Sequence, residues 1–266
     1  SMAYTCAVFP KEDSTLEEAQ EEKFDLVCRK LDIQPGMRLL DVGCGWGGMV
    51  RHATKHYGAR AIGVTLSKQQ AEWGQAMLER EGLADHSEVR FGDYRDVPEA
   101  GFDRVSSIGL TEHIGKKNYP AYFSFLYSKL LPQGRLLNHS ITRSDPKEGT
   151  LMRRGFINRY IFPDGELTHV SHLIDQAGIA GFEPQHSENL RVHYAMTLRD
   201  WSRNLDAAWD ESVAEIGPRK ARVWRLYLAA SRYGFVTDRI QLHQVLSTRN
   251  DSDGVSGMPL RPTWGS

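Results

Sequence analysis

The stretch from Leu39 to Gly48, LLDVGCGWGG, constrains the fold more than any other part of the chain. Its first half has the apolar composition of a buried parallel strand, and its second half breaks into glycines, which is typical of a nucleotide-binding loop. Gly43, Gly45 and Gly47 have the spacing G-x-G-x-G, whereas Gly43, Gly45 and Gly48 have the spacing G-x-G-x-x-G. Because both patterns are present, the loop alone leaves the nucleotide open.

Strand and helix patterns alternate on both sides of this loop. Apolar runs predict strands at 38–42, 60–65, 88–92, 103–108 and 134–141, and helical periodicity predicts helices at 15–31, 47–57, 67–81 and 118–131. This alternation is typical of an α/β fold, in which helices cover both faces of a mostly parallel sheet. Ligands of such folds bind at the C-terminal edge of the sheet.

The alternation ends after residue 142. We interpret 143–172 as an insertion over the active site, because it is too long for an ordinary connection. Within it one helical face carries four apolar residues, which form either plain core or a wall of a substrate channel: Phe156, Ile157, Tyr160 and Ile161. Helices follow at 197–215 and 218–233 and a strand at 238–248. Residues 1–248 are thus predicted to form one domain, and 249–266, rich in Ser, Gly, Asp and Pro, a flexible tail.

Composition excludes several classes of protein. The net charge of -1 among 266 residues gives no basic footprint for nucleic acid. The cysteines at 6, 28 and 44 form no pairing pattern, so we expect a reducing, cytoplasmic setting and neither a disulfide framework nor a metal cluster. No apolar run approaches the roughly 20 residues of a membrane span, and no signal peptide is recognisable, so membrane contact is expected only at the surface. Ser1 and Met2 are either native or a cloning remnant, and the presence of an upstream segment is open.

The end of the second predicted strand argues against a dinucleotide. NAD-binding folds carry an acidic residue there, which holds the ribose hydroxyls. This strand instead ends in Thr65, Leu66 and Ser67, and no carboxylate follows before Glu72. A different nucleoside cofactor is therefore favoured.

Acidic and aromatic residues at two other strand ends fit S-adenosylmethionine. Asp41 directly precedes the glycines, where its carboxylate can face the ammonium group of a cofactor. Asp93 can accept a hydrogen bond from the adenine amino group, and Tyr94 can stack on the ring. Asp93 by itself is equally well explained as a turn residue, so the combination carries the interpretation.

Eight segments in order make the chain similar to a known family. They are YTCAVF at 4–9, LLDVGCGWGG at 39–48, GVTLSKQQ at 63–70, DYRD at 93–96, SIGLTEHIGKKNY at 107–119, NHSIT at 138–142, YIFPDGEL at 160–167 and HYAMTLRDW at 193–201. From residue 4 to about 248 the chain resembles the cyclopropane fatty acid synthase family, which includes the mycolic acid cyclopropane synthases. The resemblance implies a Rossmann-like class I methyltransferase fold with a seven-stranded sheet.

The resemblance also implies a reaction and its site. The methyl donor would be S-adenosylmethionine, the acceptor a cis-unsaturated acyl chain, usually of a phospholipid, and the base a bound bicarbonate ion. By matching motifs, the residues that hold bicarbonate are Cys6, Glu112, His139, Ile141 and Tyr194. Glu112 would accept the bicarbonate hydroxyl proton, while His139, Tyr194 and the backbone N–H of Ile141 would donate to its oxygens. The implied cofactor residues are Tyr4, Thr5, Leu39, Asp41, Gly43, Gly45, Gly47, Thr65, Leu66, Ser67, Gln70, Asp93, Tyr94 and Arg95.

The product stays open at this stage. Methyl transfer to an alkene leaves a carbocation, which bicarbonate deprotonates to give a cyclopropane or a methylene or methyl branch. Many family members have an aromatic residue just before the Glu-His pair, where this chain has Leu110 and Thr111, and a late-helix cysteine of many members corresponds here to Ser231. The first departure lies near the reacting groups and therefore leaves the outcome undecided.

Each proposed site residue also has a purely structural explanation. Taken singly, His139 fits a core histidine, Cys6 and Tyr194 packing residues, and Glu112 a carboxylate at a helix N-terminus. Alternative functions are N-methylation of a small molecule, as in the coclaurine-type enzymes, a non-catalytic lipid-binding or cofactor-binding module, and, more remotely, an NAD oxidoreductase. Three arginines fit either phospholipid head groups or a solvated basic face: Arg153, Arg154 and Arg159. The oligomeric state cannot be read from the sequence.

Overall fold

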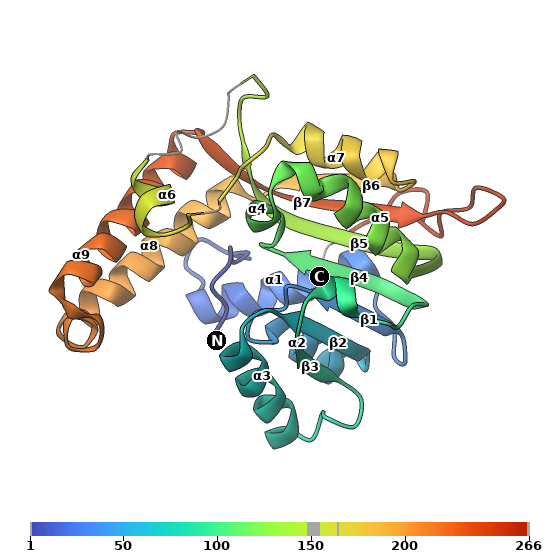
Figure 1. Cartoon of the computed structure of the whole chain (residues 1–266), viewed down its shortest axis with the longest axis horizontal. Coiled ribbons are helices and arrows are strands. Elements are labelled where there is room, and N and C mark those ends of the chain that lie inside the picture. Colours follow the sequence, from blue (N-terminus) through green and yellow to red (C-terminus); the bar gives the residue numbers. More distant parts are fainter. Residues whose placement is uncertain (1, 148–154, 164, 265–266) are drawn as a thin grey trace.

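The computed structural model describes residues 2–147, 155–163 and 165–264, which fold around one central sheet (Figure 1). Its strands are β1 (Arg38–Val42), β2 (Arg60–Thr65), β3 (Glu88–Phe91), β4 (Phe102–Ile108), β5 (Leu130–Arg143), β6 (Glu183–Asn189) and β7 (Ile240–Arg249). Their order is β3-β2-β1-β4-β5-β7-β6. The pairs among β1 to β5 are parallel, and β7 runs antiparallel to β5 and β6. The predicted α/β architecture is confirmed.

Helices cover both faces of the sheet. One face carries α1 (Leu16–Leu31), α2 (Gly48–Tyr57) and α3 (Lys68–Arg80), and the other carries α5 (Tyr119–Lys129) and α7 (Val170–Ile179) (Figure 1). The short helices α4 (Thr111–Ile114) and α6 (Phe156–Tyr160) and the longer α8 (Arg191–Ala207) and α9 (Trp209–Val236) complete the set, together with single turns at Tyr94–Asp96 and Lys116–Asn118. The alternation predicted up to residue 142 therefore forms the layered part of the domain.

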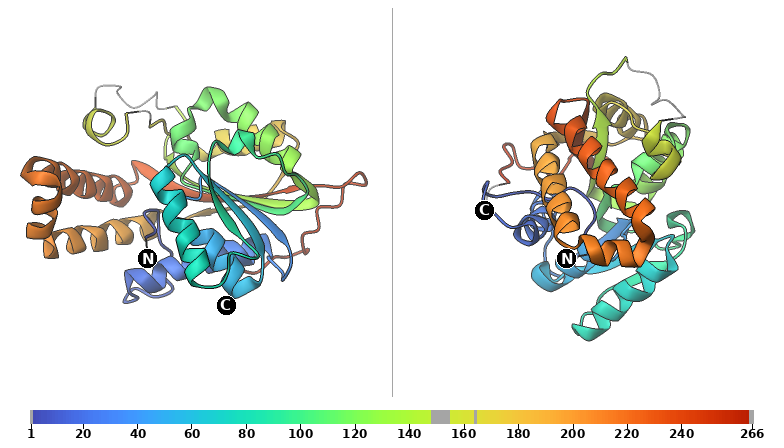
Figure 2. Two further views of the ribbon diagram at one scale, coloured as in Figure 1. Left: turned by 60° about the horizontal axis from the view of Figure 1, so that its bottom comes forward. Right: turned by 90° about the vertical axis from the view of Figure 1, so that its left-hand side faces the viewer.

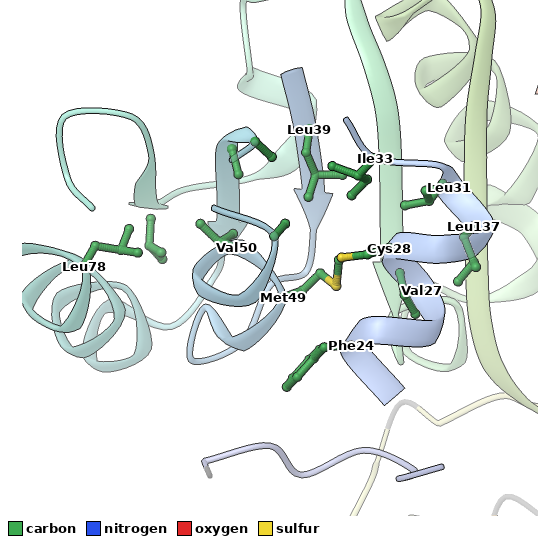
Figure 3. Packing of buried hydrophobic residues seen from close by; sticks show 14 of the residues in the cluster. Phe24, Val27, Cys28, Leu31, Ile33, Leu39, Met49, Val50, Leu78 and Leu137 are labelled. Carbon is green, nitrogen blue, oxygen red and sulfur yellow. The ribbon is translucent and has the colours of Figure 1, made fainter. Parts of the chain in front are cut away.

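Successive residues of β1 serve the two faces. A strand points neighbouring side chains to opposite sides, so Leu39 packs under α1 and α2 with Phe24, Cys28 and Met49 (Figure 3). Leu40 packs on the opposite side with the aromatic side chains of α5. Both leucines are fully buried. β1 is therefore anchored on both faces, which fixes the position of the glycine loop that follows it.

The α8–α9 pair stands beyond the C-terminal ends of the parallel strands (Figures 1 and 2). Our sequence-based boundaries were wrong here, because α8 begins at Arg191 rather than 197 and ends at Ala207. The second helical segment starts at Trp209 and is kinked at Gly217, whose φ of 80° interrupts the helix just before Pro218. Glycine tolerates that dihedral and proline starts a helical turn well, so the chain bends at this pair.

Two elements, β6 and α7, were not predicted. α7 begins at Val170, inside the segment assigned to the insertion, and β6 forms the edge of the sheet beside β7. The C-terminal segment up to residue 264 contains neither helix nor strand. Its Trp264 accepts a hydrogen bond at its carbonyl oxygen from Arg29 Nε at 3.0 Å and packs edge-on against His186.

Among the residues described, none of the helices is both long enough and apolar enough to cross a bilayer.

Candidate functional site

The glycine loop connects β1 to α2 through left-handed backbone. Gly43, Gly45 and Gly47 have φ values of 75°, 55° and 75°. L-residues other than glycine adopt these angles at a cost of roughly 1–2 kcal/mol. A Cβ atom on Gly45 would lie 3.2 Å from the hydroxyl oxygen of Tyr4. The loop therefore needs glycine both for its backbone angles and for the close approach of the N-terminal segment.

A cavity of about 400 Å³, called here the cofactor cavity, lies beside this loop. It lies where the sheet order reverses between β1 and β4, which is where ligands bind in doubly wound α/β folds. The predicted cofactor residues that line it are Tyr4, Thr5, Asp41, Gly43 and Gly45, and further lining side chains include Lys23, Trp46 and Trp73. The structure thus brings the N-terminal segment and the glycine loop to one cavity.

Two buried side chains of opposite charge line the cofactor cavity. Asp41 is 2% exposed and accepts a hydrogen bond from Ser106 Oγ at 2.6 Å. Burial raises its pKa to about 6, and the bond from Ser106 opposes this shift. Lys23 is 1% exposed and donates to Thr5 Oγ1 at 3.0 Å, and burial lowers its pKa to about 7. The sequence analysis missed Lys23, because nothing in the α1 pattern separates it from the solvated lysines of a helix.

A hydrogen-bonded chain joins three more predicted residues at the edge of the sheet. Thr65 Oγ1 lies 2.9 Å from Gln70 Oε1, and Gln70 Nε2 donates to the Tyr4 hydroxyl at 3.1 Å. Ser67 caps the N-terminus of α3 by accepting from the backbone N–H of Gln70, and Leu66 is 71% exposed. This chain ties the end of β2 to the N-terminal segment, although Thr65, Leu66, Ser67 and Gln70 do not line the cavity themselves.

The residues expected at the adenine lie outside the cofactor cavity. Asp93 accepts from the backbone N–H of Arg95 at 2.9 Å and also pairs with its guanidinium group. Hydrogen bonding from Arg95 lowers the pKa of Asp93. Tyr94 packs edge-on against Tyr122 and Phe125. Asp93 and Tyr94 follow β3, two strands from β1, so they stand at the same edge of the sheet as the glycine loop.

Leu39 departs from its expected role. Its side chain lies in the hydrophobic core near the start of β1 and lines neither cavity, because only the end of that strand reaches the ligand edge.

A second cavity, called here the acyl cavity, lies between the strand ends and the α8–α9 pair. Its volume is about 310 Å³, and all five residues predicted to hold bicarbonate line it: Cys6, Glu112, His139, Ile141 and Tyr194. These residues come from four separate parts of the chain, since His139 and Ile141 share β5, so their convergence is a property of the fold. Tyr4, Thr5 and Gly109 line both cavities, which places the two spaces next to each other.

Glu112 enters the acyl cavity from α4, directly after β4. Its Oε1 accepts the backbone N–H of Ile141 at 2.6 Å, and the side chain is buried. Burial raises its pKa to about 7, while the bond from Ile141 opposes that shift. Tyr119 holds α4 by donating to the carbonyl oxygen of Thr111 at 3.1 Å, and Glu166 N–H donates to the carbonyl oxygen of Glu112 at 2.8 Å. The Ile141 N–H that we expected to face an anion thus binds Glu112 here.

His139 lies in the C-terminal half of β5 and is 1% exposed. Its Nδ1 is 3.2 Å from Nε2 of Gln244, the residue opposite it on β7. Its Nε2 is buried and has no hydrogen-bond partner among the described residues. Burial is the main cause that holds the pKa of His139 well below its usual value, and Lys23 and Lys30 add to the effect. His139, which lines the acyl cavity, is therefore neutral near pH 7, and one of its ring nitrogens has no partner in the part of the chain that the structure describes.

Cys6 and Tyr194 complete the predicted set. Cys6 is fully buried, and burial raises the pKa of its thiol, so it stays protonated and is a poor nucleophile. Burial likewise raises the pKa of the Tyr194 phenol, which keeps its proton as a hydrogen-bond donor. The Tyr194 ring lies 4.5 Å from that of Phe235, centroid to centroid.

The remaining wall of the acyl cavity is mostly apolar and aromatic. The insertion contributes Ile157, Phe162 and Leu167, and α9 contributes Tyr227 and Phe235. Ser231, where many relatives were expected to have cysteine, also lines it. Tyr160, which shares the predicted apolar face with Ile157, is instead 46% exposed. The insertion thus supplies part of the wall.

One group of metal-ligating side chains occurs among the described residues. Glu21 of α1 and His52 and His56 of α2 bring one ligand atom each to within 4.8 Å of one another. Neither histidine lines either cavity. Glu21, by contrast, lines the cofactor cavity.

Comparison with known proteins gives a family. The family model described as mycolic acid cyclopropane synthetase matches residues 1–245. The chain is 58% identical to a probable fatty acid methyltransferase of Mycobacterium tuberculosis over 99% of its own length and 61% of that protein. It is 36% identical to the cyclopropane-fatty-acyl-phospholipid synthase of Escherichia coli K12 over 96% of its own length and 64% of that protein. It therefore spans less than two thirds of either relative.

Solved structures agree with the sequence comparison. A crystal structure of the mycolic acid cyclopropane synthase CmaA1, complexed with SAH and CTAB, superimposes with a TM-score of 0.86 at 35% identity. The match covers 92% of this chain and 89% of that one. The shared architecture is the seven-stranded sheet of class I methyltransferases, which confirms the fold that the resemblance implied.

Proposed function

The chain belongs to the mycolic acid cyclopropane synthetase family, and from that premise we propose that it methylates the cis double bond of an unsaturated acyl chain, using S-adenosylmethionine. The observation that carries the proposal is the pair of adjoining cavities. One is bordered by the glycine loop and two buried charges, and the other is apolar and lined by Cys6, Glu112, His139, Ile141 and Tyr194.

The cofactor cavity suits the amino-acid end of S-adenosylmethionine. Buried charges are retained in proteins when they have partners, and a zwitterion offers a partner to each. Asp41 would hold the ammonium group, Lys23 the carboxylate, and Asp93 with Tyr94 the adenine. When bound, S-adenosylmethionine supplies an electrophilic methyl group. Both cavities are lined by Tyr4, Thr5 and Gly109, so the methyl group would have to face the acyl cavity beside these three residues.

The acyl cavity suits a small anion beside an apolar chain. His139 and Tyr194 line it, and the unpartnered Nε2 of His139 and the protonated phenol of Tyr194 would both be available to an oxygen anion. Glu112 would accept a hydroxyl proton from the same anion. When bound, bicarbonate supplies a proton acceptor that needs no mobile side-chain charge in an apolar space.

Positioning and aromatic rings would carry the rest of the catalysis. An alkene is a weak nucleophile, and holding it in line with the methyl group can lower the barrier by roughly 7–11 kcal/mol at best. The π electrons form the new carbon–carbon bond, and the adjacent carbon becomes cationic. Phe162, Tyr194, Tyr227 and Phe235 line the cavity, where their faces stabilise such a cation. Loss of a proton from the new methyl group then closes a cyclopropane, and loss after a hydride shift leaves a methylene branch.

Transfer of label tests this function. Purified protein incubated with methyl-labelled S-adenosylmethionine, bicarbonate and vesicles of a cis-unsaturated phospholipid should move label into the acyl chains. Vesicles of the matching saturated phospholipid are the control and should stay unlabelled. If the protein binds the cofactor but no acyl chain becomes labelled, the proposal is contradicted.

Replacing two glycines with alanine, one at a time, distinguishes an effect on cofactor binding from an effect of backbone strain on stability. Gly45 and Gly82 have φ values of 55° and 69°, but only Gly45 lies at the cofactor cavity, and a Cβ atom on Gly82 would meet no atom within 4 Å. In both Gly45→Ala and Gly82→Ala, backbone strain should lower the free energy of unfolding by roughly 1–2 kcal/mol, and Gly45→Ala adds a close contact with Tyr4. Calorimetric titration should find weaker S-adenosylmethionine binding in Gly45→Ala alone. Equal affinity for S-adenosylmethionine in both variants would show that the cofactor does not bind beside the glycine loop.

We also propose that the outer side of α9 contacts the membrane surface. Leu226, Tyr233 and Val236 are more than half exposed there, and exposed arginines such as Arg222 and Arg232 flank them. An apolar stripe between basic residues favours anionic lipid surfaces. Arg159 is exposed near Tyr160, while Arg153 and Arg154 lie outside the described residues. Sedimentation with anionic vesicles should be reduced by Tyr233→Ser, and an unchanged bound fraction would exclude this face.

A further inference from the structure

We infer that Gln244 and Lys30, which line neither cavity, act as positioning residues that fix the ring tautomer of His139. The inference deepens the proposed function, on which it rests for the role of the His139 Nε2 atom. It explains why the Nε2 atom presents a hydrogen, rather than a lone pair, to the acyl cavity.

The three residues form one buried chain of hydrogen bonds. Lys30 of α1 donates from Nζ to Gln244 Oε1 at 2.7 Å, and Gln244 Nε2 lies 3.2 Å from His139 Nδ1. The Lys30 side chain is 0% exposed and forms an ion pair with Glu188 of β6, which is 37% exposed. Antiparallel pairing of β5 with β7 sets His139 directly opposite Gln244. The chain therefore runs from solvent at Glu188 to the acyl cavity at His139.

The donor and acceptor roles along this chain follow from Lys30. A lysine that is ion-paired, as Lys30 is with Glu188, offers only hydrogen-bond donors, and its Nζ atom donates to the amide oxygen of Gln244. The oxygen of the Gln244 amide must therefore face Lys30, which leaves its NH₂ group facing His139. An NH₂ group can only donate, so His139 Nδ1 must accept. In a neutral imidazole with Nδ1 as acceptor, the hydrogen is on Nε2.

The surroundings keep His139 in this neutral form. The ring is buried, and the charged groups that act on it, Lys23 and Lys30, both disfavour a second proton. No carboxylate in the described structure hydrogen bonds to Nδ1, which is the usual arrangement that would reverse the tautomer.

The consequence is a preference for anions in the acyl cavity. The Nε2 atom has no partner among the described residues, and His139 lines the cavity with Glu112 and Tyr194. As an N–H group it complements a bound oxygen anion, whereas the opposite tautomer would direct a lone pair at that anion. Lys30 and Gln244 thus shape the anion site through His139, without touching it.

The substitution Gln244→Glu tests the tautomer directly. A carboxylate at this position accepts from both Lys30 and His139, so Nδ1 should take up the hydrogen. Nitrogen NMR of protein labelled in its ten histidines, with His139 assigned from the signals lost in His139→Gln, distinguishes protonated from unprotonated ring nitrogens. In the unaltered protein Nε2 should be protonated and Nδ1 unprotonated, and in Gln244→Glu Nδ1 should be protonated.

A matched control is Gln185→Glu on β6, the strand next to β7. Gln185 donates to Thr248 Oγ1 at 3.0 Å and lines neither cavity, so this variant makes the same chemical change away from His139. Its His139 signals should match those of the unaltered protein. If the unaltered protein carries the hydrogen on Nδ1, or has a charged ring near pH 7, the inference is wrong, whether or not Gln244→Glu folds.

Kinetics supply the second readout. At a pH where the spectra find a neutral ring, Gln244→Glu should raise the KM for bicarbonate by roughly 10- to 100-fold, the effect of losing one hydrogen bond to a charged group. The affinity for S-adenosylmethionine should not change. An unchanged KM for bicarbonate with a reversed tautomer would overturn the link to anion binding. Because the NMR result does not depend on turnover, absence of lipid methylation in the unaltered protein would reject the proposed function alone.

Discussion

Replacing Glu112 with glutamine should reduce lipid methylation by roughly 100-fold or more, because proton acceptance by a positioned side chain contributes about that much to catalysis. The glutamine can still accept the N–H of Ile141, so the local structure should persist. It cannot accept the hydroxyl proton of bicarbonate in the way a carboxylate does. Cofactor affinity should stay unchanged, since Glu112 lines only the acyl cavity.

The same substitution should stabilise the folded chain above neutral pH. Burial raises the pKa of Glu112 from the model-compound value of 4.5 to about 7. Between these two pH values the folded state holds a proton that the unfolded state has released, so stability from this group falls as pH rises through that window. Above about pH 7 the ionised carboxylate carries its full desolvation cost, which a neutral glutamine lacks. At pH 8 the variant should be more stable by up to about 3 kcal/mol.

Urea unfolding at pH 5, 6, 7 and 8 measures this difference. The gain of Glu112→Gln over the unaltered protein should grow with pH and level off above about 7. Glu72→Gln is a control, because Glu72 is 66% exposed and forms an ion pair with Lys68 at 3.6 Å. Exposed pairs of this kind contribute roughly 0–1 kcal/mol. A Glu112→Gln variant that is less stable at pH 8 would contradict the raised pKa of Glu112. A variant that keeps full activity would contradict its role as proton acceptor.

Bicarbonate depletion should have the second large effect. In buffer freed of carbon dioxide, methylation should fall by at least roughly tenfold, because a positioned base contributes about 100-fold or more. Added bicarbonate should restore the rate with saturation, whereas chloride at equal ionic strength should not. The measured binding of S-adenosylmethionine should be the same in both buffers. A full rate of methylation without bicarbonate would contradict the proposal that His139 and Tyr194 bind this anion.

The layered part of the fold could be predicted from the sequence because its signals are local. β1 is apolar on both faces and ends in glycines, and Thr15 and Glu18 form a capping box at the start of α1. β6 gave no comparable signal. Its sequence, EPQHSEN, is polar because the strand lies at the sheet edge and is held by backbone pairing with β7. α7 was hidden for another reason, since it begins inside a segment that reads as one long insertion.

The site was predictable only in part, for reasons of the same kind. Cys6, Glu112, His139, Ile141 and Tyr194 were reached through motif resemblance, and the fold brings all five to one cavity. Lys23, Lys30 and Gln244 escaped notice because their importance comes from burial and from contacts between distant segments. Lys30, for example, meets Gln244 from 214 positions away along the chain. No periodicity in α1 separates a lysine that will be fully buried from one that will face solvent.

Mass spectrometry of membrane lipids tests the central claim most directly. Cells expressing the chain should contain unsaturated phospholipids that have gained one CH₂ unit per modified acyl chain, and fragmentation should place the added carbon at the former double bond. Cells expressing Glu112→Gln at the same level should lack these species. A lipid profile identical in both cells, with only the original unsaturated chains, would contradict methylation of acyl double bonds by this protein.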